Sequence, residues 1–349
     1  MSHPLAIVAA LVLLVRLGLW LYKHRGAPTG RDVPAAGLVP RSELVEVGSE
    51  PADPAARAAL DAAGAGNWRP AAAYLSDGDA DWSTRYARLN PFGDLAATDD
   101  TWLRQWREEQ PDNPEAAQVQ TDALVKRAWE IRTGKYASQV SREQAIGFHQ
   151  VLQEAAEVSF EAVRLAPAGD PNAWVMQQPI AMGQGWSHER YRALWSEIVA
   201  REPHHYGAHA AALQYWCEKW LGSNELMHGF ADKAIAGAPA GSLLTVLKLR
   251  AYWEQVLRDE SAAPLHRSAE YTAALDAALA DLAAADPAHP GIVPARGWIA
   301  YGLIENGRPA QALDLFRAMG REIAGPWLYY GNPAAVFDAA RTKAARAAA

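Results

Sequence analysis

The sequence has a single cysteine, Cys217, among its 349 residues. One thiol excludes an internal disulfide framework and any metal site built from several cysteines. We expect Cys217 to pack as a small buried hydrophobic side chain. Hydrophobic residues make up 50% of the sequence, enough to build the core of one large domain or two smaller ones.

An excess of basic residues is also missing. The chain has 33 Lys and Arg against 40 Asp and Glu, which gives a formal net charge of −7 and a pI near 5.8. Surfaces that bind nucleic acid are usually marked by clustered positive charge. We therefore expect no nucleic-acid partner.

The common catalytic motifs are absent as well. The sequence contains no Gly-x-Ser-x-Gly nucleophile elbow, no phosphate-binding P-loop and no glycine-rich dinucleotide fingerprint. We predict no catalytic residue and no cofactor, so an enzyme is the less favoured interpretation. It stays open, because a site assembled from residues far apart in the chain leaves no local spacing to recognise.

One long apolar run is present, near the N-terminal end. Leu5 to Tyr22 is apolar except for Arg16, and a helix of that length spans about 27 Å, close to the thickness of a bilayer core. Basic residues come after the run rather than before it, which argues against a cleaved signal peptide and favours a cytoplasmic location for the rest of the chain. We predict residues 1–25 as a single-pass anchor in the cell membrane.

The remaining chain divides by composition. Residues 26–54 are rich in Pro, Gly and Ala without sustained apolar periodicity, and we predict a flexible linker there. From residue 55 to 349 the pattern is that of successive helices. Asn113 with Pro114, for example, is a typical helix start. We predict residues 55–349 as one helical domain.

The clearest internal pattern lies between Asn172 and Ser242, where two helix pairs repeat at an offset of 36 positions. Ser187 recurs as Ser223, each at the place of a helix N-cap. The apolar stripes are Tyr191, Leu194, Trp195, Ile198 and Val199 in the first unit and Met227, Phe230, Ala231, Ala234 and Ile235 in the second. This spacing places each stripe on one face of a helix, which we assign to the core.

A third helix pair, from Ile292 to Met319, has Asn306-Gly307-Arg308-Pro309 between its helices. Together with residues 172–203 and 208–239, it resembles degenerate tetratricopeptide units. The resemblance implies an all-α fold of stacked antiparallel helix pairs, a tetratricopeptide-like solenoid.

A second resemblance rests on Trp220-Leu221-Gly222-Ser223, Met227, Phe230-Ala231 and residues 238–242. These residues are similar to an uncharacterised bacterial family, a domain of unknown function with tetratricopeptide-like helices. That resemblance implies no reaction, ligand or catalytic residue.

The binding candidates come from the expected solenoid, whose first helices line a concave, peptide-binding face. Gln178 and Gln214 occupy equivalent positions 36 residues apart, and their amides are suited to clamp an extended backbone. Tyr215, His205 and His209 are further candidates. We therefore predict a protein or peptide partner.

His205 and His209 also suggest an alternative to the protein-interaction hypothesis. His205 and His209, at i and i+4, would share a helix face and are secondary candidates for zinc ligands. No His-Glu-x-x-His motif accompanies them, and we predict no metal site. The sequence thus favours a membrane-anchored scaffold or adaptor with a cytoplasmic helical domain, and the alternative is an enzyme or metal-binding protein that uses this His-rich repeat.

Overall fold

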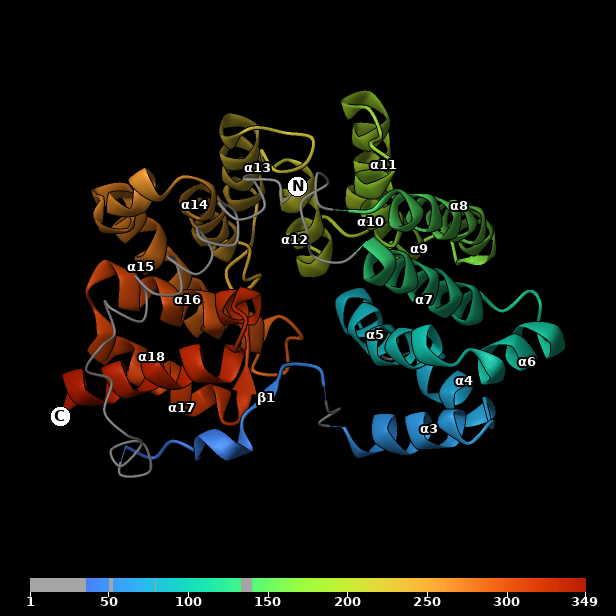
Figure 1. Cartoon of the computed structure of the whole chain (residues 1–349), viewed down its shortest axis with the longest axis horizontal. Coiled ribbons are helices and arrows are strands. Elements are labelled where there is room, and N and C mark those ends of the chain that lie inside the picture. The colour runs from blue at the N-terminus through green and yellow to red at the C-terminus, as the bar shows by residue number, and fades with distance from the viewer. Residues whose placement is uncertain (1–35, 50–52, 79, 133–139) are drawn as a thin grey trace, which may run out of the picture. The chain divides into compact units, whose positions relative to one another are not determined.

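The computed structural model describes residues 36–49, 53–78, 80–132 and 140–349. Within these residues the chain is helical apart from one short two-stranded sheet (Figure 1). The prediction of an all-α fold is confirmed. The described residues form two compact units, one of residues 47–295 and one that joins residues 36–46 to residues 296–349.

The larger unit is a succession of helices. They are α3 (Pro54–Gly64), α4 (Arg69–Leu75), α5 (Trp82–Thr98), α6 (Thr101–Glu109), α7 (Pro114–Arg132), α8 (Arg142–Leu165), α9 (Asn172–Val175), α10 (Gln177–Gly183), α11 (His188–Arg201), α12 (Tyr206–Tyr215), α13 (Asn224–Ala236), α14 (Val246–Arg258), η3 (Glu260–Arg267) and α15 (Ala269–Ala284). Helix α16 (Ile292–Asn306) begins in this unit and continues into the smaller one.

The smaller unit combines the two ends of the described chain. Its elements are η1 (Arg41–Glu43), β1 (Val45–Glu46), η4 (Pro309–Ala312), α17 (Leu313–Met319), β2 (Glu322–Ile323), η5 (Gly325–Tyr329) and α18 (Pro333–Ala348). Strands β1 and β2 pair in parallel, with Val45 opposite Glu322.

Polar side chains at helix starts explain where several helices begin. Ser187 and Ser223 accept hydrogen bonds from backbone N–H groups at the first turns of α11 and α13, with N···O distances of 3.3 and 3.2 Å. Asn113 does the same for α7, at 2.9 Å from the nitrogen of Ala116. These bonds satisfy N–H groups that have no partner inside the helix. The predicted caps Ser187 and Ser223 are confirmed.

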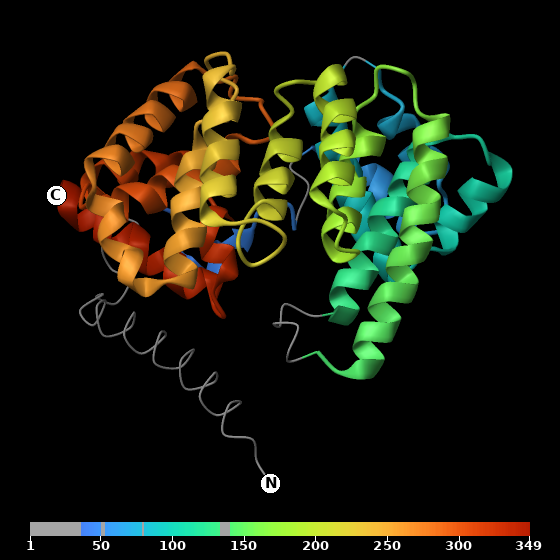
Figure 2. The same cartoon turned by 90° about the horizontal axis from the view of Figure 1, so that it is seen from above.

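Helices α7 and α8 pack side by side as a long antiparallel pair (Figure 2). Leu124 of α7 and Phe148 and Leu152 of α8 lie in their shared core, and Ile180 of α10 joins them. Helix α10 therefore extends the stack from this pair toward α11 and α12, with which it is also in contact.

The predicted apolar stripes are buried only in part. Tyr191, Leu194 and Ile198 of α11 are core residues, as are Met227 and Ala231 of α13. The remaining stripe residues are half-buried: Trp195, Val199, Phe230, Ala234 and Ile235. One edge of each stripe therefore stays open to solvent or to a ligand.

The predicted linker and domain boundaries differ from the structure. Residues 36–46, placed in the linker at 26–54, belong instead to the smaller unit. Leu38 is buried, and the backbone oxygen of Val39 accepts a hydrogen bond from Nη1 of Arg341 at 3.1 Å. The predicted single domain, residues 55–349, is correspondingly divided between the two units. Composition indicated a tether because these contacts are made across almost the whole length of the chain.

The predicted membrane localisation needs a correction. Among the described residues, no helix combines the length and the apolar character needed to cross a bilayer. Helices α7 and α8 are long, at 19 and 24 residues, but both carry several charged side chains. The predicted anchor, residues 1–25, lies outside the described residues. A single-pass membrane protein is therefore a wrong prediction for the part of the chain that the structure describes.

Candidate functional site

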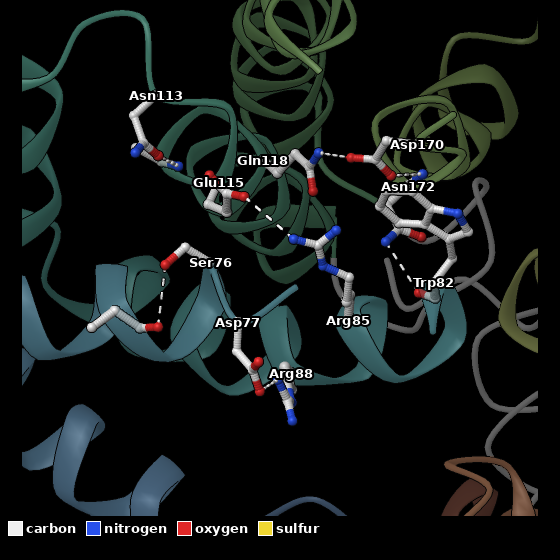
Figure 3. Close-up of polar contacts among 12 residues, drawn as sticks. Ser76, Asp77, Trp82, Arg85, Arg88, Asn113, Glu115, Gln118, Asp170 and Asn172 are labelled. Carbon is white, nitrogen blue, oxygen red and sulfur yellow. Dashed lines mark hydrogen bonds and ion pairs between the residues drawn. The ribbon is translucent and has the colours of Figure 1, made fainter. Parts of the chain in front are cut away.

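A buried polar network links α7 to the start of α9 (Figure 3). Asp170, in the turn before α9, accepts a hydrogen bond from Nε2 of Gln118 at 2.6 Å and one from the backbone nitrogen of Asn172 at 2.7 Å. Nδ2 of Asn172 donates to the backbone oxygen of Trp82 at 3.1 Å. Burial raises the pKa of the Asp170 carboxyl, and the two hydrogen bonds oppose that rise.

The network continues to His205, at the N-cap of α12. Nδ1 of His205 accepts from the backbone nitrogen of Ala208 at 3.1 Å, so Nε2 carries the proton and donates to Oδ1 of Asn172 at 3.0 Å. Burial lowers the pKa of His205 to about 4. Because both ring nitrogens are bonded, His205 caps a helix and joins it to α9, and no nitrogen is left for a metal ion or a substrate.

The predicted clamp residues Gln178 and Gln214 do not form a common surface. Gln178 is only 2% exposed, and its Oε1 accepts a hydrogen bond from the Tyr191 hydroxyl at 3.3 Å. Gln214 donates through Nε2 to Glu254 at 2.6 Å. Tyr215 is buried too, with its hydroxyl donating to the backbone oxygen of Trp186 at 2.7 Å. The structure thus places all three in contacts within the protein.

His209 is in a different position from His205, although the two are one helical turn apart. Its Nδ1 lies 3.0 Å from the backbone oxygen of His205, so Nδ1 carries the proton and donates. Burial lowers the pKa of His209 to about 4, which keeps the ring neutral at pH 7. Within the described chain Nε2 has no hydrogen-bond partner, and the ring lines a pocket.

This pocket, hereafter the α11–α13 pocket, has a volume of about 530 Å³. Helices α11 and α13 flank α12 (Figure 1), and all three contribute to the lining. The aromatic part of the wall consists of Trp195, Trp216 and Phe230. Gly229 and Gly237 leave room on the α13 side, because a Cβ atom at either position would meet nothing within 4 Å.

The charged side chains of the lining are unevenly balanced. Arg192 and Lys233 supply two positive charges, and Glu225 supplies one negative charge. The Arg192 guanidinium lies over the Trp216 ring, 5.4 Å from its centroid. In the described residues neither Arg192 nor Lys233 forms an ion pair. The pocket therefore offers an aromatic surface beside an excess of one positive charge.

The described residues offer few ligands for a metal ion. In the ranges that the structure describes, no three or more His, Cys, Asp or Glu side chains are grouped so that they could hold an ion. Cys217 is buried, as predicted, and burial raises the pKa of its thiol to about 11. The thiol consequently stays protonated at pH 7 and is a poor ligand or nucleophile.

The sequence interpretation missed most of the pocket. It assigned Trp195 and Phe230 to the core because they fall on a 3.6-residue stripe, and it did not consider Arg192 or Lys233. One signal was available: Gly229 stands next to Phe230 in α13 and Gly237 caps the end of that helix, and small residues near a half-buried aromatic ring leave space. Of the predicted binding residues, only His209 lines the pocket.

Comparison with known proteins adds no relative. No family model, no curated protein and no solved structure matches the chain. The functional argument therefore rests on the α11–α13 pocket and its chemistry.

Proposed function

We propose that the protein is an interaction scaffold or adaptor with tetratricopeptide-like stacked helix pairs, and that its α11–α13 pocket receives a segment of a partner protein. The observation that carries the proposal is the pocket itself. A volume of about 530 Å³ lies within the range of about 300–1,000 Å³ that is usual for ligand sites. Aromatic walls with a few polar groups are the usual composition of such sites.

The repeat interpretation supports this proposal. Helices α9 and α10 followed by α11, and α12 followed by α13, form two consecutive helix groups, and equivalent serines cap α11 and α13. Stacked helical repeats commonly present extended binding surfaces. The pocket is lined mainly by the second helices of these groups, whereas the sequence prediction placed the site on the first helices, at Gln178 and Gln214.

The charge of the lining favours one type of partner segment. Arg192 and Lys233 lie at exposed positions without ion pairs, so they attract acidic groups at little desolvation cost. Leu226, which is 38% exposed, adds an apolar rim to the same pocket. An apolar side chain within an acidic or neutral segment suits this surface best.

The alternative, an enzyme or metal-binding protein that uses the His-rich repeat, has no specific observation in its favour. His205 is occupied at both nitrogens by Asn172 and Ala208. His209 lines the pocket, but in the described chain no group of three or more His, Cys, Asp or Glu side chains is placed so that it could hold an ion. We therefore keep the interaction proposal alone.

A photo-crosslinking experiment tests the proposal. A photoreactive amino acid replaces Leu226 at the rim of the pocket, and in a matched protein it replaces Ala193, an exposed residue of α11 outside the pocket. Irradiation of cells that naturally produce the protein should yield a discrete protein adduct at position 226 and none at 193. Identical adducts at both positions, or none at 226, would contradict the proposal.

A pocket-filling variant makes the same experiment specific. Gly229→Trp places a large side chain in the empty space of the pocket without displacing a neighbouring atom at its Cβ. The adduct at position 226 should disappear in this variant and persist in Ala193→Trp. Circular dichroism of both variants checks that the helical fold is retained.

A further inference from the structure

We infer that the α11–α13 pocket binds a tryptophan side chain of the partner, whose indole N–H donates a hydrogen bond to Nε2 of His209. The inference rests on the proposed function and specifies the ligand of the same site. Four features carry it: the tautomer of His209, the burial of its ring, the aromatic walls and the positive charge of the lining.

The tautomer is set by a neighbouring carbonyl group. Nδ1 of His209 lies 3.0 Å from the backbone oxygen of His205, a pure acceptor, so Nδ1 must carry the proton. In a neutral imidazole the other nitrogen is then an acceptor only. Nε2 of His209 therefore requires a donor, and a ligand that offers only acceptors cannot satisfy it.

The free nitrogen of His209 is open to the pocket. The residue as a whole is only 3% exposed and no described residue donates to its Nε2, but this atom is not among the buried unpaired ones. A ligand that fills the pocket excludes water from Nε2, which costs free energy unless the ligand supplies an N–H donor. The ring also lines the pocket, so a bound group reaches it directly.

The surrounding rings favour an aromatic ligand. Trp195 meets His209 edge to face at a centroid distance of 4.8 Å and meets Phe230 at 5.2 Å. Trp195 and Phe230 both lie against the His209 ring, and Trp216 lines the same pocket. Aromatic groups gain from edge-to-face and offset contacts with such walls beyond the area they bury.

Among donors, indole fits this environment better than the alternatives. Its N–H is a donor with no accepting atom, so nothing on it is left unpaired against apolar walls. A phenol would bring lone pairs that need donors, and an ammonium group would meet two positive side chains, Arg192 and Lys233, against the single negative charge of Glu225. Tryptophan is also enriched among the residues that dominate binding energy at protein interfaces.

Calorimetric titration of the purified full chain with two synthetic probes tests the inference. The probes are N-acetyl-tryptophanamide and its 1-methylindole analogue, which differ only in the indole N–H. The wild-type protein should bind the first about tenfold more tightly, because the methylated ring leaves Nε2 of His209 unpaired. Equal affinities of the two probes would overturn the inference.

Two variants assign the preference to the pocket. In His209→Phe, which keeps a ring and removes the acceptor, both probes should bind with the same affinity. In Gly229→Trp neither should bind. A preference that survives His209→Phe, or binding that survives Gly229→Trp, would place the indole elsewhere and overturn the inference. The comparison uses the ratio of the two probes' affinities for the same variant, so a change in the stability of that variant does not affect it.

The outcome also separates the two proposals. If crosslinking at position 226 captures a partner but the probes are not distinguished, the interaction role stands and the indole assignment fails. If the probes are distinguished and position 226 gives no adduct, the pocket has the inferred chemistry and the scaffold role fails.

Discussion

Two histidines of the same helix illustrate how position decides the role of a residue. His205 stands at the N-cap of α12, where the first turn leaves a backbone N–H without a partner inside the helix. Both nitrogens of its ring are hydrogen-bonded, one to Ala208 and the other to Asn172. His209, one turn later, makes one bond to the backbone and presents its other nitrogen to the α11–α13 pocket. The same spacing suggested a shared metal-binding face in the sequence.

The burial of His205 predicts a pH dependence of stability. Its pKa is about 4 in the folded protein and 6.5 as the ordinary value, so the unfolded chain binds more protons between these limits. The contribution of His205 is therefore complete above pH 6.5 and is lost as the pH falls toward 4. Urea unfolding should show a loss of roughly 2 kcal/mol from this residue between pH 7 and pH 5.

A matched variant isolates this effect. His205→Asn keeps an N-cap oxygen but removes the titrating ring, so its stability should change less between pH 7 and pH 5 than that of the wild type. The comparison is needed because burial raises the pKa of Asp122 and Asp170, which opposes the histidine effect. An unchanged pH dependence in the variant would contradict the assignment.

Cys217 gives a second prediction at this scale. Its side chain is 2% exposed and burial raises its thiol pKa to about 11, so little thiolate exists at pH 8. Ellman's reagent should leave the native protein unmodified at pH 8 and react with one thiol per chain after unfolding in guanidinium chloride. Rapid reaction of the native protein would show that the thiol is accessible.

At the scale of the element, the serine caps of α11 and α13 are expected to contribute equally. Ser187→Ala and Ser223→Ala each remove the acceptor of a first-turn N–H and should each lower the free energy of unfolding by about 1 kcal/mol. Ser196→Ala is the control, since the Ser196 hydroxyl bonds only to a carbonyl one turn back within α11. Urea unfolding should find no loss for the control.

Two helix glycines should respond in opposite directions. Gly229→Ala adds a Cβ in open space within α13 and should stabilise the protein by about 0.5–1 kcal/mol. Gly297→Ala in α16 would place a Cβ 2.4 Å from the backbone oxygen of Ala324, so it should destabilise by roughly 1–3 kcal/mol. Thermal unfolding of both variants measures the difference. Equal shifts in the melting temperature would contradict the prediction and show that the backbone near Ala324 moves at little cost to accommodate the added Cβ.

Local signals explain which elements were predictable. Asn113 with Pro114, and Ser187 and Ser223, indicate helix starts through bonds that each span three residues, so both partners lie close together in the sequence. The helices expected after them are present. Periodicity also identified the buried part of the α11 stripe, because burial follows the helix turn.

Non-local contacts explain the rest. Gln118 meets Asp170 across 52 residues, and Asn172 meets His205 across 33, so no spacing in the sequence reveals either pair. The pocket was hidden for a related reason: periodicity indicates which face of α13 is apolar, but not whether a neighbouring helix covers Phe230.

At the scale of the whole molecule, residues 36–46 are expected to be part of the smaller unit's stability. Nε of Arg317 donates to the backbone oxygen of Ala36 at 2.8 Å, and the fully buried Arg341 donates to that of Val39. A chain that starts at Val47 would leave a buried guanidinium without that acceptor. Hydrogen exchange in α17 and α18 should therefore become faster.

The larger unit is the internal control for this deletion. Exchange in α7 and α11 should be unchanged, because residues 36–46 belong to the smaller unit. A second control removes residues 1–35 only, which keeps Ala36 and Val39 in place and should leave α17 and α18 protected. Equal exchange in the protein that starts at Val47 and in the full chain would contradict a structural role for residues 36–46.

The pairing of β1 with β2 also imposes an order on biosynthesis. Val45 leaves the ribosome early, but its partner Glu322 is translated only after the whole larger unit has been made. At about 5–20 residues per second, that interval is on the order of ten seconds to a minute. During this interval Leu38 lacks the C-terminal part of the smaller unit and stays exposed. The larger unit, in contrast, already has all of its residues and is free to fold. A nascent chain stalled before β2 should thus be open to proteases around Arg41 and protected in α7 and α8.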